Sequence, residues 1–179
     1  MHFFAKLVTA LPAIAGVASA AVIPRDVDAS TMTTDLQGLT TMSSDTDTLA
    51  KEIDATKPQS SIDVVNSLRD LIKATTKDAA AAADTQPFSD DASQQQVCNA
   101  YNTFATTQTA MLNTLTAKAN DANASGLGAP IGAALRVLEG ADDTYSFEII
   151  EAVPTCADAA KADKTTLDTA MEAAVNAYS

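Results

Sequence analysis

Apolar residues recur at steps of three and four along nearly the whole chain from residue 30 onward, and no other feature constrains the fold as strongly. The first series is Met32, Leu36, Leu39, Met42, Leu49 and Ile53. Such steps place side chains on one face of an α-helix, whereas a half-buried strand requires strict alternation. Glycine is scarce and alanine abundant, which also favours helix over strand. The sequence therefore predicts an all-α protein.

Two helices are expected in the first half of the chain. Ser30 is the expected N-cap of the first helix, which Lys57-Pro58 ends. The second helix is expected to open at Ser60, because Asp63 follows it in the spacing of a capping box. We expect this helix to fade in the alanine run near Ala83.

A third and a fourth helix follow on either side of one clear loop. Ser89 is the expected cap of a third helix of about 30 residues, and Asp90 and Asp91 lie in its first turn, where carboxylates interact favourably with the helix dipole. Residues 123–130 contain two glycines and a proline, which is typical of a loop. Pro130 then suits the first turn of the fourth helix.

The remaining signals complete a bundle. Gly140 offers an alternative break that would divide the fourth helix into two, and Pro154 ends it. The apolar face of the last helix is formed by Leu167, Met171, Ala174, Val175 and Tyr178. Short connections make sequential helices antiparallel neighbours. We therefore expect an up-and-down bundle of about five amphipathic helices, forming a single domain over residues 30–179.

The first 20 residues have the three parts of a secretory signal peptide. Lys6 supplies the positive charge, residues 7–17 the apolar run, and Ala18-Ser19-Ala20 the small residues before a cleavage site. The apolar run has about eleven residues, whereas a membrane-spanning helix needs about 20, and no later segment comes closer. We therefore expect an exported protein without a transmembrane segment. Residues 21–29 form a short N-terminal segment, in which Arg25 is the candidate end of a pro-segment.

The chain that remains after cleavage is strongly acidic, with ten basic and 23 acidic residues and a formal charge of −13. Phosphate backbones and anionic membranes attract basic patches, so nucleic acid and anionic lipid surfaces are excluded as partners. The only histidine, His2, leaves with the signal peptide. Catalysis by Ser-His-Asp or Cys-His arrangements and histidine metal sites are excluded with it. We expect no catalytic residue, no cofactor and no metal ion.

Two acidic pairs, Asp90/Asp91 and Asp142/Asp143, raise the question of a carboxylate site. Adjacent residues on a helix do not face each other, and neither pair has the ligand spacing of a calcium loop. A hydrolase with two carboxylates would need well-separated acids that converge in a cleft. We therefore expect both pairs to cap helices or to face solvent.

Cys98 and Cys156 are the only cysteines, and an exported chain reaches an oxidising compartment. In an alternating bundle the third and fifth helices run parallel, so a cysteine early in one lies near a cysteine at the start of the other. We expect a disulfide that closes a loop of 58 residues. Two buried free thiols are the alternative, and a reactive nucleophile would lack a histidine partner.

Asn123-Ala124-Ser125 is the only N-glycosylation sequon in the chain. It falls in the loop expected over residues 123–130, and export would expose it to the glycosylation machinery. Asn123 is therefore the candidate glycosylation site. The motif is also common by chance, so an unmodified surface asparagine is the alternative.

Several short patterns occur in a recognisable order over some 150 residues. They are Arg25-Asp26-Val27 after the signal, Ser89-Asp90-Asp91 before a long helix, Gly128-Ala129-Pro130-Ile131 before Leu135 and Leu138, and Ala152-Val153-Pro154. In this order the chain resembles the fungal hydrophobic surface-binding protein A family, which includes the cell-wall galactomannoproteins. The resemblance implies an extracellular helical protein that adsorbs to hydrophobic surfaces or holds lipids such as fatty acids between its helices.

The resemblance also has a limit at the C-terminus. Wall-anchored members carry a Ser/Thr-rich stalk and a hydrophobic tail for a lipid anchor, whereas this chain stops at Tyr178-Ser179. We therefore expect secretion with loose association to the cell wall rather than a covalent anchor. Partners implied by such a setting are apolar surfaces, fatty-acid-like lipids, cell-wall polysaccharide or a secreted esterase.

The apolar stripe of the third helix separates two hypotheses for function. Its largest residues are Tyr101, Phe104, Met111, Leu112 and Leu115. If they line a channel between the helices, the protein binds fatty-acid-like ligands. If they pack a closed core, the protein is a structural or antigenic cell-wall mannoprotein without a small ligand. The sequence alone leaves both open.

Overall fold

The computed structural model describes residues 27–179, so the expected signal peptide and the candidate pro-segment cleavage at Arg25 lie outside the described residues. The described chain forms five helices: α1 (Ala29–Lys51), α2 (Pro58–Ala82), α3 (Asp91–Ala124), α4 (Gly128–Ala152) and α5 (Ala157–Ala177). These residues contain no strand. The prediction of an all-α bundle of about five helices is confirmed.

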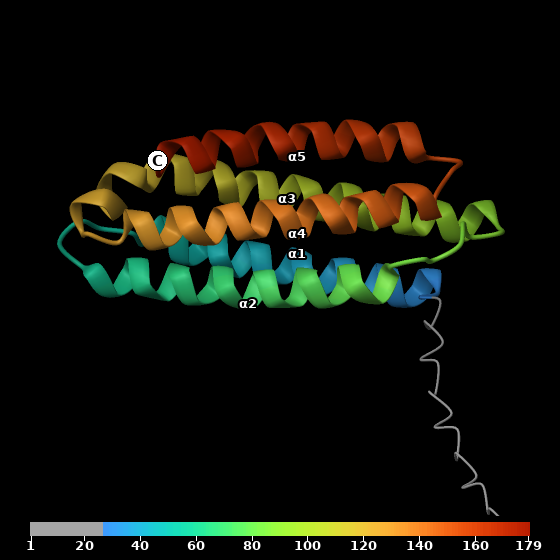
Figure 1. Ribbon diagram of the computed structural model, residues 1–179, viewed down its shortest axis with the longest axis horizontal. Helices are drawn as coiled ribbons and strands as arrows, with labels where there is room; N and C mark the ends of the chain where they lie inside the picture. The colour runs from blue at the N-terminus through green and yellow to red at the C-terminus, as the bar shows by residue number, and fades with distance from the viewer. Residues whose placement is uncertain (1–26) are drawn as a thin grey trace, which may run out of the picture.

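The helices alternate in direction and form two layers (Figure 1). Helices α1, α3 and α5 run one way and α2 and α4 the other. In the first layer α3 packs against both α1 and α5, and in the second layer α2 packs against α4. The expected up-and-down directions are therefore present. However, α2 and α3 make almost no contact, so the expectation that all sequential helices are neighbours is wrong for this pair, whose connection crosses between the layers.

The starts of α1 and α3 differ from the predicted caps. The carboxylate of Asp28 accepts a hydrogen bond from the Thr31 amide at 2.7 Å, so Asp28 rather than Ser30 caps α1. The carboxylate of Asp90 likewise accepts from the Ser93 amide at 2.8 Å and replaces Ser89 as the cap of α3. At both ends an aspartate lay within two residues of the predicted serine, and a negative charge interacts better with the positive end of the helix dipole.

The connection between α1 and α2 also differs from the prediction. Helix α1 ends at Lys51, and α2 begins at Pro58 rather than Ser60, because proline has no amide hydrogen to leave unpaired at a first helical position. The Ser60 hydroxyl instead donates to the Lys57 carbonyl at 2.8 Å, inside the turn. Asp63 accepts from the Gln59 side chain and takes no part in a capping box.

Helix α4 passes through Gly140 without a break, so the alternative of two shorter helices is wrong. It begins at Gly128, and α3 continues to Ala124, so Asn123 lies in the last turn of α3 and not in a loop. A Cβ atom at residue 128 would lie 1.6 Å from the Asn123 Oδ1 atom. Glycine at this position therefore lets the two helix ends meet across a turn of only three residues, 125–127.

Candidate functional site

The five apolar residues of the α3 stripe lie together in the core. Tyr101, Phe104, Met111, Leu112 and Leu115 are each no more than 1% exposed. The rings of Tyr101 and Phe104 are 6.3 Å apart, and the Tyr101 hydroxyl donates a hydrogen bond of 2.8 Å to Ser146 on α4. None of these five side chains lines any of four surface grooves that described residues form between and beside the helices. In this structure the stripe is packed core.

The interior between α3 and its neighbouring helices is called the seam below. One turn along it from Phe104 lies a polar pair that the sequence analysis missed. The Gln108 side-chain amide donates to the Asp142 carboxyl, and both side chains are buried. The side-chain oxygen of Gln108 and the other carboxyl oxygen of Asp142 have no hydrogen-bond partner among the described residues. Burial raises the pKa of Asp142 well above its ordinary value, although the hydrogen bond from Gln108 acts in the opposite direction.

The burial of Asp142 contradicts the expectation that the pair Asp142/Asp143 caps a helix or faces solvent. Asp143 is exposed and forms an ion pair with Lys164 at 2.6 Å, whereas Asp142 points into the core. The periodicity contained the signal. Asp142 occupies the same face as the buried series Leu135, Leu138, Tyr145 and Ile149, and Gln108 occupies the same face as the buried series Val97, Tyr101, Phe104, Met111 and Leu115. Two polar residues at core positions of facing helices indicate a buried pair.

A groove between α4 and α5 leads to Asp142. It has a volume of about 450 Å³ and is lined by Glu139, Asp142, Asp143, Lys164, Leu167, Asp168, Met171 and Glu172. Its only cation, Lys164, is already paired with Asp143 and with Asp168, at 2.6 and 2.7 Å. An anionic headgroup entering this groove would meet a surplus of carboxylates. The groove is therefore unsuited to hold the carboxylate of a fatty acid.

Helix α5, which covers one side of the seam, is anchored mainly by small residues. Its buried residues are Ala160, Leu167, Ala170, Met171 and Ala174, so only two large side chains enter the core. At its C-terminal end, the Tyr178 hydroxyl donates to the Leu115 carbonyl at 2.8 Å. Because alanine buries little apolar area, α5 is the helix whose displacement would cost least hydrophobic free energy.

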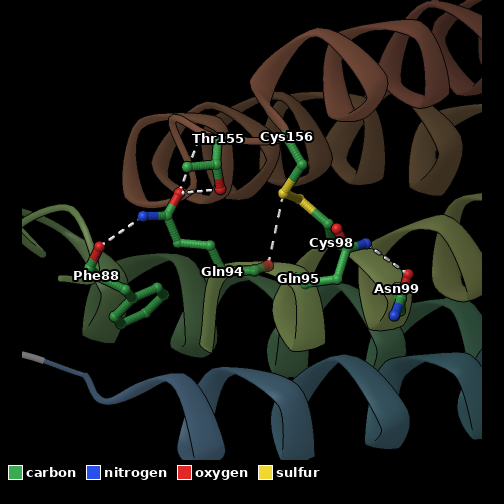
Figure 2. The surroundings of a disulfide bond; sticks show 7 residues. All are labelled: Phe88, Gln94, Gln95, Cys98, Asn99, Thr155 and Cys156. Atoms are coloured by element: carbon green, nitrogen blue, oxygen red, sulfur yellow. Dashed lines mark hydrogen bonds between the residues drawn. A yellow bond between two sulfur atoms is a disulfide. The ribbon is translucent and has the colours of Figure 1, made fainter. Parts of the chain in front are cut away.

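The N-terminal end of α5 is fixed covalently (Figure 2). The predicted bond between Cys98 and Cys156 is present, with Cα atoms 6.5 Å apart and a sequence separation of 58. Beside it lies Gln94, which the sequence analysis did not single out. Its side-chain amide donates to the Phe88 carbonyl at 2.7 Å, and its oxygen accepts from the amide and hydroxyl of Thr155 at 2.8 and 2.7 Å. Gln94 thus joins the α2–α3 connection, α3 and the start of α5.

Other expected features can be placed as well. Asn123 is exposed at the end of α3. In the part of the chain that the structure describes, no group of three or more His, Cys, Asp or Glu side chains could hold a metal ion. None of the five helices combines the length and the apolar character that crossing a membrane requires.

The fold and this interior define a class of protein: an all-helical bundle with an apolar seam, closed at one end by a disulfide. Residues 32–151 match the family described as hydrophobic surface binding protein A. The chain belongs to this family, and the resemblance expected from the sequence is confirmed. No curated protein sequence matches the chain.

Solved structures share the fold. Afmp4p in complex with palmitic acid superposes with a TM-score of 0.79 at 20% identity, covering 85% of this chain and 100% of that one. Ligand binding domain 1 of the MP1 protein of Penicillium marneffei, complexed with arachidonic acids, has a TM-score of 0.74 at 16% identity, covering 87% and 99%. Domain 2 of the same protein, complexed with multiple arachidonic acids, has a TM-score of 0.74 at 16% identity, covering 86% and 97%. At these identities the likeness shows the fold.

Proposed function

We propose that this is a secreted, non-catalytic protein that adsorbs to apolar surfaces and holds fatty-acid-like lipids between its helices. The observation that carries the proposal is the family match, which covers α1 to α4 almost completely. The three structural neighbours, which hold palmitic or arachidonic acid in the same fold, support the lipid part. Export is supported by the disulfide, since such bonds persist in oxidising compartments.

The energetics of the interior are adequate for such a ligand. Burying a sixteen-carbon chain gains about 0.8 kcal/mol per methylene, or roughly 12 kcal/mol in total. Association and ordering remove about half of that, which leaves about 6 kcal/mol, or a dissociation constant of roughly tens of micromolar. The five apolar residues of the α3 stripe are the proposed lining. Because these side chains are packed in the core, a lipid between them must displace a helix, and α5 is the proposed mobile element.

Delipidated protein titrated with a fluorescent fatty acid tests the lipid part. We expect saturable binding with a dissociation constant of roughly tens of micromolar, and displacement by unlabelled palmitic acid. Native mass spectrometry of protein purified from culture fluid should show co-purified fatty acid. If no fatty acid binds at any attainable concentration, the interior-ligand proposal is wrong.

A second candidate is favoured by the closed packing itself. None of the four surface grooves is lined by the α3 stripe, as expected of a structural cell-wall protein with no small ligand. Adsorption to apolar beads without any fatty-acid binding would support this candidate. N-terminal sequencing of extracellular protein tests export in either case: we expect Ala21 or Asp26 as the first residue, and retention of Met1 would contradict it.

A further inference from the structure

Helix α4 carries apolar residues on its outer side as well as on its inner side. Three large hydrophobic side chains are exposed among the described residues, and two of them, Val137 (57% exposed) and Phe147 (55% exposed), lie on α4. The exposed residues at steps of four and three along this side are Ala133, Val137, Gly140, Thr144 and Phe147. We call these five residues the outer stripe. The inner side of the same helix is filled by the core series, so the outer stripe is a second apolar face.

The outer stripe contains no charge and no unpaired polar side chain. The Thr144 hydroxyl donates to the Gly140 carbonyl at 2.9 Å and so needs no water. At Gly140 no neighbouring atom lies within 4 Å of a virtual Cβ, so nothing in the chain covers the middle of the stripe. The outer stripe could therefore be dehydrated without burying a charge. Burying a charge is the costliest part of dehydrating a protein surface.

Charged residues flank the outer stripe, and those on one side are engaged with neighbouring segments. Arg136 bonds Ser179, and Asp143 is paired with Lys164 of α5. On the other side, burial and the nearby acids Glu151 and Asp84 raise the pKa of Glu148. The acids on both sides would repel an anionic membrane or nucleic acid. The chemistry that fits the stripe is therefore an uncharged apolar partner.

The shape of the outer stripe indicates a flat partner. Val137 and Phe147 are ten residues apart, or about 15 Å along the helix axis. Their side chains protrude from a convex helix, with only glycine and threonine between them. A groove adjoins Phe147, but acidic residues line it and it does not reach Val137. A plane, by contrast, touches both protruding side chains at once. A second copy of the chain is a poor occupant, because the formal charge of −12 on each molecule opposes close approach.

We propose that the outer stripe of α4 is the face by which this protein adsorbs to uncharged apolar surfaces. This inference rests on the proposed function and specifies which side of the bundle meets the surface. It also separates two activities in space: the outer side of α4 contacts the surface, while the seam between α3 and its neighbours holds the lipid.

The competing face is the outer side of the α1–α3–α5 layer. Its two grooves also lack charge: Thr33, Gln37, Thr40, Thr41, Gln96, Asn99, Ala100 and Thr103 line one, and Thr109, Asn113, Thr165, Thr166, Thr169, Ala170 and Ala173 line the other. However, the apolar atoms of this face are alanine and threonine methyl groups, interspersed with amides and hydroxyls, and none of its lining residues is a large apolar side chain. Dehydrating amides against an apolar surface gains nothing, so the outer stripe is favoured.

The test is adsorption of the full mature chain to polystyrene beads, measured as the partition of protein between beads and solution at low coverage. The double variant Val137→Ser/Phe147→Ser should lower the partition at least about tenfold, because it removes most of the exposed apolar area of α4. The matched control is Ile62→Ser on α2, which removes the third exposed large hydrophobic residue, 39% exposed, and should change the partition less than twofold. Phe147→Leu should retain adsorption.

Two control measurements accompany the adsorption test. Thermal melts should show that all variants fold as the wild type does, because the changed side chains are exposed. Fluorescent fatty-acid binding should be unchanged in the double variant. If the wild type itself does not adsorb, the proposed function fails; if the wild type and the double variant adsorb equally, only the outer stripe is refuted. Asn99→Asp places a charge in a groove of the competing face, so a larger loss of adsorption from this variant than from the double variant would overturn the assignment. Dimerisation of the wild type that the double variant abolishes would also overturn it.

Discussion

Asp142 determines part of the pH dependence of stability, because its carboxyl is buried among core side chains. Its pKa is raised in the folded protein, so the folded state binds this proton more tightly than the unfolded state does. The stabilising contribution is therefore complete below the unfolded pKa of about 3.9 and is lost as pH rises toward the folded value. Asp28, Asp54 and Asp90, whose pKa values are lowered, contribute in the opposite direction.

Asp142→Asn should remove this loss and make the protein more stable at neutral pH. The asparagine oxygen still accepts from Gln108 and carries no charge, so we expect a gain on the order of 1 kcal/mol or more at pH 7 and little change at pH 4. Urea unfolding at both pH values measures it. Asp143→Asn, one residue further along, keeps the buried carboxyl and should keep the wild-type fall in stability. Equal pH dependence in Asp142→Asn and the wild type would contradict this role.

Phe104 tests whether the core residues of α3 also line the lipid site. It is 1% exposed beside Tyr101, so Phe104→Ala should cost about 3 to 5 kcal/mol in the delipidated protein. Under the proposed function, added fatty acid should restore part of that loss and the preferred chain length should shift. Thermal melts and titrations of the same variant measure both. Ile53→Ala, in the α1–α2 connection, should lose stability without a changed lipid preference; the same pattern in Phe104→Ala would mean ordinary core packing.

At the residue scale, apolar periodicity predicted which side chains are buried, and the structure buries every member of the α3 stripe. It did not reveal the polar members of the core. Gln108 and Asp142 are 34 residues apart, and they meet only because α3 and α4 pack in one particular register. Gln94 is buried for a similar reason, since its partners Phe88 and Thr155 come from two connections. Such pairings depend on the placement of whole helices, which local spacing does not specify.

Gln94, near the N-terminal end of α3, joins this helix by hydrogen bonds to the α2–α3 connection and to the α4–α5 connection. Gln94→Ala would leave the Phe88 carbonyl and the Thr155 amide without their partner in a part-buried site, so we expect a loss of about 1 to 3 kcal/mol. The matched control is Gln95→Ala. Gln95 is exposed and its side chain donates a hydrogen bond to the exposed Asn99, so its truncation should change stability by no more than about 0.5 kcal/mol. Similar losses in the two variants, measured by urea unfolding, would contradict the bridging role.

Helix number and approximate extent followed from the sequence, whereas helix starts and neighbours did not. Ser30 and Ser89 were the predicted caps, but an aspartate within two residues of each serine is the actual cap. Cap preference among neighbouring candidates differs by only a few tenths of a kcal/mol, so spacing alone does not decide between them. Likewise, a short connection predicts antiparallel neighbours, but residues 83–90 are long enough to cross the bundle and leave α2 and α3 apart.

Viewed as a whole, the molecule carries far more acid than base, and this limits how densely copies can cover a surface. With a formal charge of −12, or −13 after removal of Lys6, adsorbed molecules repel one another at low ionic strength. Raising salt from about 10 to 150 mM shortens the Debye length from about 30 to 8 Å. We therefore expect the saturating amount on polystyrene to rise with salt, while partition at very low coverage changes little. A saturating amount that falls with salt, measured by quartz-crystal microbalance, would contradict this.

The disulfide also determines how this molecule responds to mechanical tension. Because Cys98 and Cys156 are joined, most of α3 and all of α4 lie within a closed covalent ring, and only the segments on either side can be drawn out when the chain is pulled from Val27 and Ser179. With a sequence separation of 58 between its cysteines, the ring keeps about 200 Å of chain from being extended under the load. A bundle that is torn from a surface by its ends therefore keeps most of its longest helix, and the outer stripe of α4, inside a segment that the load never reaches.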